Sequence, residues 1–502
     1  MSLPLAVALR LNARRFPRRP ALRFGQWEWG YAELYAKVCR LMNALMAQGL
    51  GPRDHVALLP PNHPDTLVAY FALTGIGAIP VPINHQLDDE DLVYIARKAD
   101  TTAAILLPET ADKLGTMRGV TGRLYFLGEP DPGATGVTWL DPLMERAGDE
   151  EPSLEHAHQR VLSHTSGTTG RPKCPLRGEW AFEERAIEQG FSSDDYALSA
   201  IPLCVGIGLT YTLQSLYLGA TVRLMPSFDP AAAMDIIDRE AITATTLLPF
   251  MLRKMMEAPQ FQSFSGRSLK LIQSGAGVVE ADIRHAFHAK TGPVLSIYAA
   301  STEVGPIANL KGEDVVRYAE GNCVGRPFFG VEVKLLDDDL KEVPVGEVGE
   351  ICARSHTQYE GYYGDPELTE ETRRGDYYTV GDLGRFDADG YLYFVGRKGD
   401  VIRIGGTPIF ATEIEETLMA HPGVAEVACV DLPDTGGVTV LWAAVVPKPG
   451  CTEADLQTHC AQRLPVHKRP ARFALLDALP RTVTGRVIKN RLKTLLHEQA
   501  VS

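Results

Sequence analysis

The segment best suited to chemistry is the run Thr165-Ser166-Gly167-Thr168-Thr169-Gly170-Arg171-Pro172-Lys173. Glycine lets backbone N–H groups approach an anion closely, hydroxyl groups add further donors, and Lys173 neutralises negative charge. The run therefore has the composition of a phosphate-binding loop, although its spacing is not that of a Walker A loop. Taken alone, it is equally compatible with a surface linker, so the assignment depends on the rest of the chain.

Further short motifs follow in order along the chain. They are Ser274-Gly275-Ala276-Gly277, Tyr298-Ala299-Ala300-Ser301-Thr302-Glu303, Tyr378-Thr379-Val380-Gly381-Asp382-Leu383, Gly396-Arg397-Lys398-Gly399-Asp400 with Gly405-Gly406, Glu413-Ile414-Glu415, and Leu479-Pro480-Arg481-Thr482-Val483-Thr484-Gly485-Arg486. Together with the first run, they resemble the motifs of the adenylate-forming superfamily, which includes acyl- and aryl-CoA synthetases, peptide-synthetase adenylation domains and firefly-type luciferases. The resemblance extends over nearly the whole chain, and several motifs in the same order are more specific than any one of them.

The resemblance implies a role for each motif in binding ATP and Mg²⁺. A carboxylate suits Mg²⁺, which takes one or two carboxylates together with phosphate oxygens, and a carboxylate also accepts several hydrogen bonds from ribose hydroxyls. The implied residues are Thr165, Ser166, Gly167, Thr168, Thr169, Gly170 and Lys173 for the β- and γ-phosphates, Thr302 and Glu303 for catalysis with Glu303 on the metal, Asp382 and Arg397 for the ribose, and Tyr298, Gly275 and Ala276 for the adenine.

The resemblance also implies sites for the acid and for a thiol. Cys204, Val205 and Ile207, together with Ala300, fall where relatives form the acyl pocket, and Val205 replaces a bulky aromatic residue or histidine. Core packing explains Cys204, Val205 and Ile207 equally well. Gly405 and Gly406 would let the chain pass close to the pantetheine arm of CoA.

One departure from the family pattern concerns catalysis directly. The catalytic lysine of relatives falls at Arg486, while Lys489 stands where an arginine is usual, so the two charges are exchanged. A guanidinium is wider and more rigid than an ammonium, so it would place its charge differently. Lys489 either substitutes for the lysine, because residues three apart share a helix face, or is merely exposed.

Composition narrows the possible partners. The chain has 502 residues and a formal net charge of −13, which disfavours nucleic acid because a phosphate backbone requires a basic surface. Its eight cysteines contain no Cys-x-x-Cys pair, which favours reduced thiols and a cytoplasmic protein. The longest apolar run, residues 67–83, is interrupted by proline and glycine, so we expect no membrane span.

Alternating helical and strand patterns predict an α/β fold. We expect helices at 31–48, 67–74, 92–99 and 231–239 and strands at 55–60, 78–81, 103–107, 196–201, 221–225 and 244–248. Strands and helices that alternate in this way imply parallel sheets with helices on both faces. We expect a large N-terminal AMP-binding domain, residues 1–398, of two αβ-layered subdomains plus a small β-barrel at about 310–395. A small mobile α+β C-terminal domain, residues 399–502, would pivot at Gly399.

The leading functional hypothesis is ATP-dependent activation of a small carboxylic acid as an acyl- or aryl-adenylate, followed by thioester formation with CoA. Two alternatives stay open. The chain could be a divergent adenylating enzyme that passes the acid, or a small inorganic acid such as nitrite, to an amine or a carrier protein. It could also be a catalytically weak nucleotide- or acyl-binding protein. The sequence leaves the identity of the acid and the formation of a homodimer undetermined.

Overall fold

The computed structural model describes residues 2–129, 135–165, 172–404, 407–433, 439–482, 485 and 487–501. In the N-terminal part, strands β3 to β7 form a parallel sheet in the order β4-β3-β5-β6-β7. The strands are β3 (His55–Leu58), β4 (Ile79–Pro82), β5 (Ala103–Leu106), β6 (Arg123–Phe126) and β7 (Thr138–Trp139). β3, β4 and β5 are buried throughout, as expected for a parallel sheet covered on both faces.

Helices surround this sheet. They are α1 (Leu5–Arg15), α2 (Tyr31–Ala47), α3 (Pro64–Gly75), α4 (Asp89–Lys98), η1 (Pro108–Lys113), α5 (Leu114–Arg118) and α6 (Asp141–Ala147). Helix α3 begins earlier than its apolar pattern predicts, because His63 accepts a hydrogen bond from the backbone N–H of Asp65 and Pro64 occupies the first turn.

The second part is built on a longer sheet. Strands β1 (Pro20–Phe24), β11 (Thr221–Leu224), β10 (Tyr196–Ser199), β12 (Ala244–Thr246), β13 (Leu271–Gly275) and β14 (Leu295–Ser301) pair in parallel in this order. β2 (Trp27–Gly30) lies antiparallel to β1 at the edge. The accompanying helices are α7 (Phe182–Gln189), α8 (Gly206–Leu218), α9 (Pro230–Glu240), α10 (Pro249–Glu257), η2 (Pro259–Gln262), α11 (Ala281–Thr291) and α12 (Asp314–Arg317).

The region expected to form a small barrel instead continues the second sheet. β15 (Gly305–Lys311), β16 (Cys323–Pro327), β22 (Leu392–Arg397), β21 (Tyr377–Phe386), β18 (Gly349–Ser355) and β17 (Val331–Leu336) extend the path from β14 in this order, all antiparallel, and β20 (Arg373–Arg374) pairs with β21. Among the described residues the path is open, with no closed barrel. The prediction of a closed barrel was wrong because sequence periodicity does not say which strands pair. α13 (Pro366–Glu371) lies between β19 (Gly361–Tyr362) and β20.

The C-terminal part is a compact α+β unit, as expected. It contains η3 (Lys398–Asp400), β23 (Val401–Ile404), β24 (Thr407–Phe410), α14 (Ala411–Met419), β25 (Val424–Pro433), β26 (Thr439–Pro447), α15 (Glu453–Arg463), η4 (Val466–Lys468), β27 (Arg472–Leu475) and α16 (Lys489–Val501). β26 pairs with β25 antiparallel and with β27 parallel. Helix α15 begins at a reciprocal capping box between Thr452 and Asp455.

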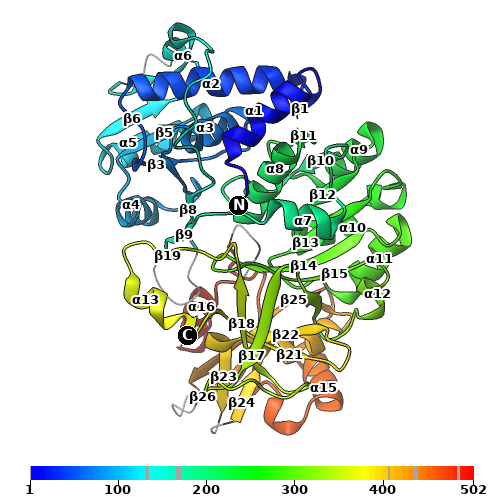
Figure 1. Cartoon of the computed structure of the whole chain (residues 1–502). Helices are drawn as coiled ribbons and strands as arrows, with labels where there is room; N and C mark the ends of the chain where they lie inside the picture. The colour runs from blue at the N-terminus through cyan, green and yellow to red at the C-terminus, as the bar shows by residue number, and fades with distance from the viewer. Residues whose placement is uncertain are drawn as a thin grey trace.

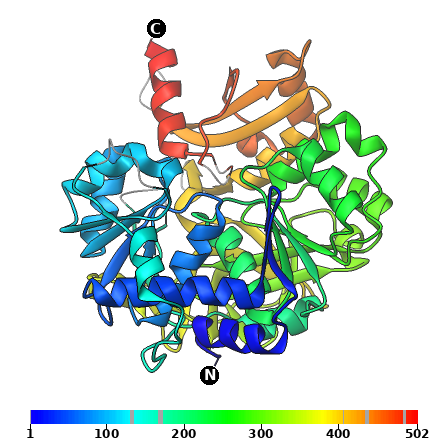
Figure 2. The same ribbon diagram turned by 90° about the horizontal axis from the view of Figure 1, so that it is seen from above.

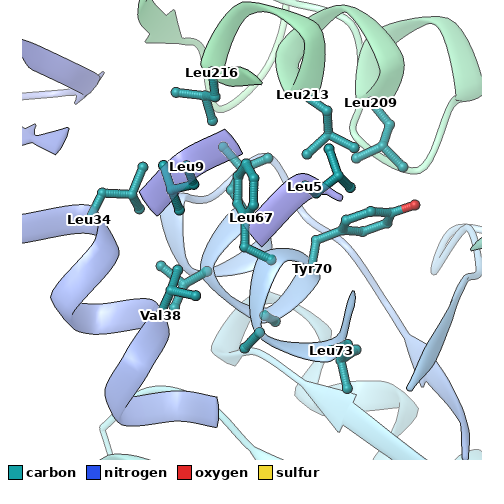
Figure 3. Packing of buried hydrophobic residues seen from close by; sticks show 14 of the residues in the cluster. Leu5, Leu9, Leu34, Val38, Leu67, Tyr70, Leu73, Leu209, Leu213 and Leu216 are labelled. Carbon is teal, nitrogen blue, oxygen red and sulfur yellow. The ribbon is translucent and has the colours of Figure 1, made fainter. Parts of the chain in front are cut away.

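One hydrophobic core joins the two sheets of the N-terminal part. Helices α1, α2 and α3 from the first part pack against α8 of the second (Figure 3). In this view Leu5 lies between Leu67 of α3 and Leu213 of α8, and Leu9 lies between Leu67 and Leu34 of α2 (Figure 3). All of these side chains have no exposed surface. Burial of a leucine side chain contributes about 1.5–3 kcal/mol, so this shared core holds the two parts as one platform.

The C-terminal part lies against one side of this platform (Figures 1 and 2). Figure 2 shows the blue first part and the green second part side by side, with the orange and red C-terminal part across both. In the described part of the chain, no helix is long and apolar enough to cross a membrane.

Candidate functional site

A β-hairpin holds the ends of the predicted phosphate loop. Its strands are β8 (Val161–Leu162) and β9 (Pro175–Arg177), which pair antiparallel. Beyond them, the backbone N–H of Thr165 donates to the carbonyl oxygen of Lys173 at 3.0 Å. The loop is thus closed at its base. Its predicted phosphate-binding residues Ser166, Gly167, Thr168, Thr169 and Gly170 lie outside the described residues.

The base of the loop lies beside the predicted metal-binding carboxylate. β9 pairs with β19, which carries Tyr362. The Tyr362 hydroxyl donates to Glu303 Oε1 at 2.6 Å, and Lys173 Nζ lies 5.3 Å from the centre of the Tyr362 ring. Burial and the adjacent Glu303 carboxylate raise the pKa of Tyr362, so its hydroxyl stays protonated and orients the carboxylate. Lys173 and Glu303, which are 130 positions apart in the numbering, therefore lie on either side of one tyrosine.

Thr302 and Glu303 occupy the tight turn between β14 and β15. Ser301 and Gly305 pair across the base of the turn, and Gly305 has a φ of +91°, which favours glycine. The guanidinium of Arg177 fixes the turn, because Nη1 donates to the carbonyl oxygen of Thr302 at 3.1 Å and Nη2 to that of Thr357 at 2.9 Å. The structure therefore holds Thr302 and Glu303 in a fixed turn beside Lys173.

The predicted adenine-binding residues lie on adjacent strands. Gly275 pairs with Tyr298, and a Cβ at position 275 would lie 2.3 Å from the Tyr298 carbonyl oxygen, so the two strands require glycine here. Ala276 follows with a φ of +64°. The Tyr298 ring is 6% exposed, with Arg185 Cζ 5.1 Å from its centre and the Phe328 ring at 5.8 Å. The contact between Tyr298 and adenine stays a prediction. In the structure, the neighbours of the ring are the Arg185 guanidinium and the Phe328 ring.

Asp382 and Arg397, predicted for the ribose, are neighbours across β21 and β22. Their Cα atoms are register partners, and Arg397 Nε lies 3.1 Å from Asp382 Oδ1. Gly381, just before Asp382, has a φ of +74°. The antiparallel register brings the two side chains together, as expected for a carboxylate oriented by a cation.

The candidate acyl-pocket residues lie at the start of α8 and the end of β14. Val205 belongs to a buried cluster, and the partly buried side chains of Cys204, Ile207 and Ala276 pack against it. Cys204 Sγ lies 3.5 Å from Asn84 Oδ1, and burial raises the pKa of its thiol to about 12, so the thiol is not a nucleophile. Ala300 is exposed on the strand that leads to Thr302. The positions of these residues are therefore consistent both with core packing and with a role in binding the acyl group.

The C-terminal tail reaches the N-terminal part near this cluster. Gly485 has a φ of +82°, and a Cβ at this position would lie 2.9 Å from Cδ1 of Phe250, which packs against the same cluster as Val205. Gly485 thus lies in close contact with α10. The adjacent Arg486, and the predicted CoA-binding residues Gly405 and Gly406, lie outside the described residues.

Lys489 is only partly exposed and pairs with Asp400. Its side chain is 20% exposed, and its Nζ lies 3.4 Å from Asp400 Oδ2. On the other side of Gly399, Lys398 Nζ lies 3.1 Å from the buried carboxylate of Glu350 in β18. Gly399 therefore separates one residue paired with the N-terminal part from one paired with α16.

Sequence reasoning missed three residues that organise this site. Arg177, Tyr362 and Arg185 act through contacts with Thr302, Glu303 and Tyr298, respectively. An arginine inside the apolar strand after the loop was the available signal for Arg177, and the run of tyrosines at 359, 362 and 363 was the signal for Tyr362. The structure as a whole is that of an α/β protein with a large N-terminal part and a small C-terminal part that packs against it (Figure 2).

Comparison with known proteins assigns the family. The AMP-binding enzyme family matches residues 9–363, and the AMP-binding enzyme C-terminal domain matches residues 413–486. This chain belongs to the AMP-binding enzyme family. It is 32% identical over 491 residues to indoleacetate–CoA ligase of Aromatoleum aromaticum, and the aligned region covers 96% of each chain.

Two solved structures resemble the whole chain. The o-succinylbenzoate CoA synthetase of Bacillus subtilis, in complex with its acyl-adenylate intermediate, has a TM-score of 0.86 at 25% identity and covers 98% of each chain. The amide bond synthetase of Marinactinospora thermotolerans has a TM-score of 0.87 at 25% identity and covers 98% of this chain and 100% of that one.

Proposed function

We propose that this chain is an AMP-forming ligase that activates a carboxylic acid with ATP and transfers the acyl group to CoA in the cytoplasm. The observation that carries the proposal is the arrangement of Lys173, Tyr362 and Glu303 at the base of the phosphate loop. Membership of the AMP-binding enzyme family and the similarity to a CoA ligase for an aromatic acid support it.

In the first step, a carboxylate oxygen of the acid attacks the α-phosphorus of ATP, and the bond to pyrophosphate breaks. Lys173 and the loop would neutralise the pyrophosphate as it leaves, since the reacting groups are all anions. Glu303 fits Mg²⁺, because a single protein carboxylate oriented by Tyr362 leaves the remaining ligand positions for phosphate oxygens. Asp382, oriented by Arg397, would accept hydrogen bonds from the ribose hydroxyls.

In the second step, a thiolate attacks the acyl carbon and AMP leaves with the electrons of the acyl–phosphate bond. We further propose that the domain boundary lies at Gly399 and that rotation there exchanges the C-terminal tail for the segment around Gly405 and Gly406. The opposite ion pairs of Lys398 and Asp400 support a pivot at this position, because each anchors a different side of Gly399.

Product analysis tests the proposal directly. We expect Mg²⁺-dependent release of AMP and pyrophosphate when the protein is incubated with ATP, CoA and a library of carboxylic acids. Release of ADP, or no ATP binding at millimolar concentration, would contradict adenylate formation and favour a weak binding protein.

A second acceptor class follows from the exchanged charges at Arg486 and Lys489. The similarity to an amide bond synthetase supports transfer to an amine, and a carrier protein is the other candidate acceptor. Adenylate that accumulates with CoA present, and is consumed when an amine or carrier protein is added, would favour these acceptors over CoA. Adenylate formation from nitrite rather than a carboxylic acid would indicate an inorganic substrate.

A further inference from the structure

A second arginine, Arg185 of α7, is buried beside the site without a hydrogen-bonding partner. Arg185 as a whole residue is 4% exposed. Within the described part of the chain, its Nε and Nη2 atoms have no hydrogen-bond partner, and it forms no ion pair. A buried, unpaired charge is strongly unfavourable, so a native structure that retains one implies a counter-charge that the described residues do not supply.

The unpartnered atoms lie on one edge of the guanidinium. Nε and Nη2 donate side by side in nearly parallel directions, which is the geometry that binds both oxygens of a carboxylate. The Tyr298 ring lies against the guanidinium, with Arg185 Cζ 5.1 Å from the ring centre. Stacking on an aromatic ring orients the guanidinium while leaving its edge free to donate.

The carboxylates near Arg185 already have other partners. On α7, Glu184 Oε1 lies 2.9 Å from His356 Nε2, and Glu188 Oε1 accepts from Lys311 at 2.7 Å. At the end of the neighbouring loop, Asp195 accepts from Ser192 at 2.7 Å and from Thr243 at 2.8 Å. Across the site, Glu303 accepts from Tyr362. Only Glu184 keeps an oxygen, Oε2, without a hydrogen-bond partner among the described residues. Glu184 is adjacent to Arg185 on α7, and adjacent residues of a helix do not face each other, so it forms no ion pair with Arg185.

Other polar groups without partners lie on α7, on α8 and on the two strands that flank β14. The buried polar layer consists of Arg185, Gln189, Tyr211, Gln273 and Asn309, and each has at least one side-chain N or O atom without a hydrogen-bond partner among the described residues. Asn309 is the register partner of Tyr298, and its Oδ1 accepts from Ser296, so its unpartnered atom is the donor Nδ2. Gln273 lies on the neighbouring strand opposite Ser296.

Tyr211 connects this layer to α8. Its hydroxyl is buried without a partner, and its ring packs against Phe191 at 6.1 Å. Burial raises the pKa of Tyr211 well above its usual range, while the positive charge of Arg185 acts in the opposite direction. The hydroxyl is therefore a neutral donor that α8 contributes to the layer.

A second cation adds to the positive potential. Arg177 lies near Tyr298 as well, and burial lowers its pKa to about 10. Its hydrogen-bond partners are backbone carbonyl oxygens, which carry no net charge. The positive charge of Arg177 therefore adds to that of Arg185. An anion that enters this layer would meet two arginines and the donors of Gln273, Asn309 and Tyr211.

We propose that the acid activated by this enzyme is a dicarboxylic acid whose second, unreacted carboxylate is bound by Nε and Nη2 of Arg185. This inference rests on the proposed function, because the first carboxylate is the one that is adenylated near Ala300 and Thr302. Tyr298 and Ala300 are two residues apart on β14, so the two ends of the acid are separated by roughly 7 Å at a rise of about 3.3 Å per residue. The layer is thus a specificity determinant for the distal end of the substrate.

Matched pairs of acids test the proposal. Pyrophosphate exchange is measured with adipate against hexanoate and with terephthalate against 4-methylbenzoate, for the wild type, Arg185→Met, Arg185→Lys and the exposed-surface control Arg267→Met. For the wild type and the control, we expect kcat/KM for each dicarboxylate to exceed that of its partner at least tenfold. In Arg185→Met this ratio falls to about one through a higher KM, and Arg185→Lys recovers part of it.

A binding measurement separates recognition from folding and from catalysis. The dicarboxylates should raise the melting temperature of the wild type in the presence of ATP, and this shift should be lost in Arg185→Met while the shift caused by ATP alone is retained. Equal use of both acids by the wild type, or an unchanged ratio in Arg185→Met, would overturn the inference and leave the proposed function intact. No exchange with any carboxylic acid, while ATP still binds, would overturn the proposed function instead.

Discussion

Two buried arginines only eight positions apart, Arg177 and Arg185, have opposite surroundings. Arg177 donates to three backbone carbonyl oxygens, those of Thr302, Glu179 and Thr357, and its guanidinium lies 5.1 Å from the centre of the Trp180 ring. Arg185 has the Tyr298 ring and no hydrogen-bonding partner for Nε or Nη2 in the described part of the chain. A charge with protein partners fixes the structure, whereas a charge without them indicates where a ligand supplies the partner.

The largest expected effect is the loss of stability when Arg177 is removed. Arg177→Met would leave the carbonyl oxygens of Thr302 and Thr357 buried without donors, which costs roughly 3 kcal/mol or more in the free energy of unfolding. Arg185→Met, in contrast, should leave that free energy unchanged or raise it, because replacing a buried unpaired charge with an apolar side chain is neutral or favourable. Urea unfolding of both variants measures the contrast, and an equal loss in the two would mean that Arg185 has structural partners of its own.

The next effect concerns the phosphate end of the site. Glu303→Gln keeps an oxygen to accept from Tyr362 but removes the negative charge, so we expect the folded state to persist and the adenylation rate to fall about 100-fold. Glu360→Gln is the matched control, because Glu360 lies on the same segment as Tyr362 and pairs with the partly exposed Arg160. Pyrophosphate exchange at several Mg²⁺ concentrations would reveal whether the metal is involved. A loss of similar size in the control would show that any charge in this region affects the rate.

A smaller effect is expected at the pivot. Gly399→Pro restricts φ and disfavours the helical conformation of Lys398, so thioester formation should slow about tenfold while adenylation is nearly unchanged. Gly399→Ala is the control, because a Cβ there would meet nothing within 4 Å. Single-turnover measurements separate the two steps. If both steps slow equally in the proline variant, the pivot lies elsewhere.

The residues that the sequence identified and those that it missed differ in how far their contacts reach. Gly275, Glu303 and Asp382 were predicted because they stand in short local motifs that resemble those of a known family. The partners that orient them come from distant segments, since Tyr362 contacts a residue 59 positions away and Arg177 one that is 125 positions away.

The same limit explains the fold predictions. Helix and strand positions followed from apolar periodicity, which is a local property. The pairing of β16 with β15 and β22, which joins the expected barrel to the large sheet, is not encoded in the pattern of any one strand.

The smallest effect is expected at Lys489 in the C-terminal tail, which resembles Arg177 in having a partner within the chain. Its Nζ lies 3.4 Å from Asp400, so we expect Lys489→Ala to change the adenylation rate by less than about threefold, below ~0.7 kcal/mol in the activation free energy.

The sequence resemblance instead places the catalytic charge at Arg486, so Arg486→Ala should lower the adenylation rate and Arg486→Lys should raise it, because an ammonium is the more compact point donor. Pyrophosphate exchange on the three variants distinguishes the two cations. A damaging Lys489→Ala together with a silent Arg486→Ala would mean that Lys489 leaves Asp400 and acts at the phosphate during the reaction. If none of the three variants changes the rate by more than about threefold, neither cation contributes to the chemistry, and the contact of Gly485 with Phe250 would serve closure of the lid alone.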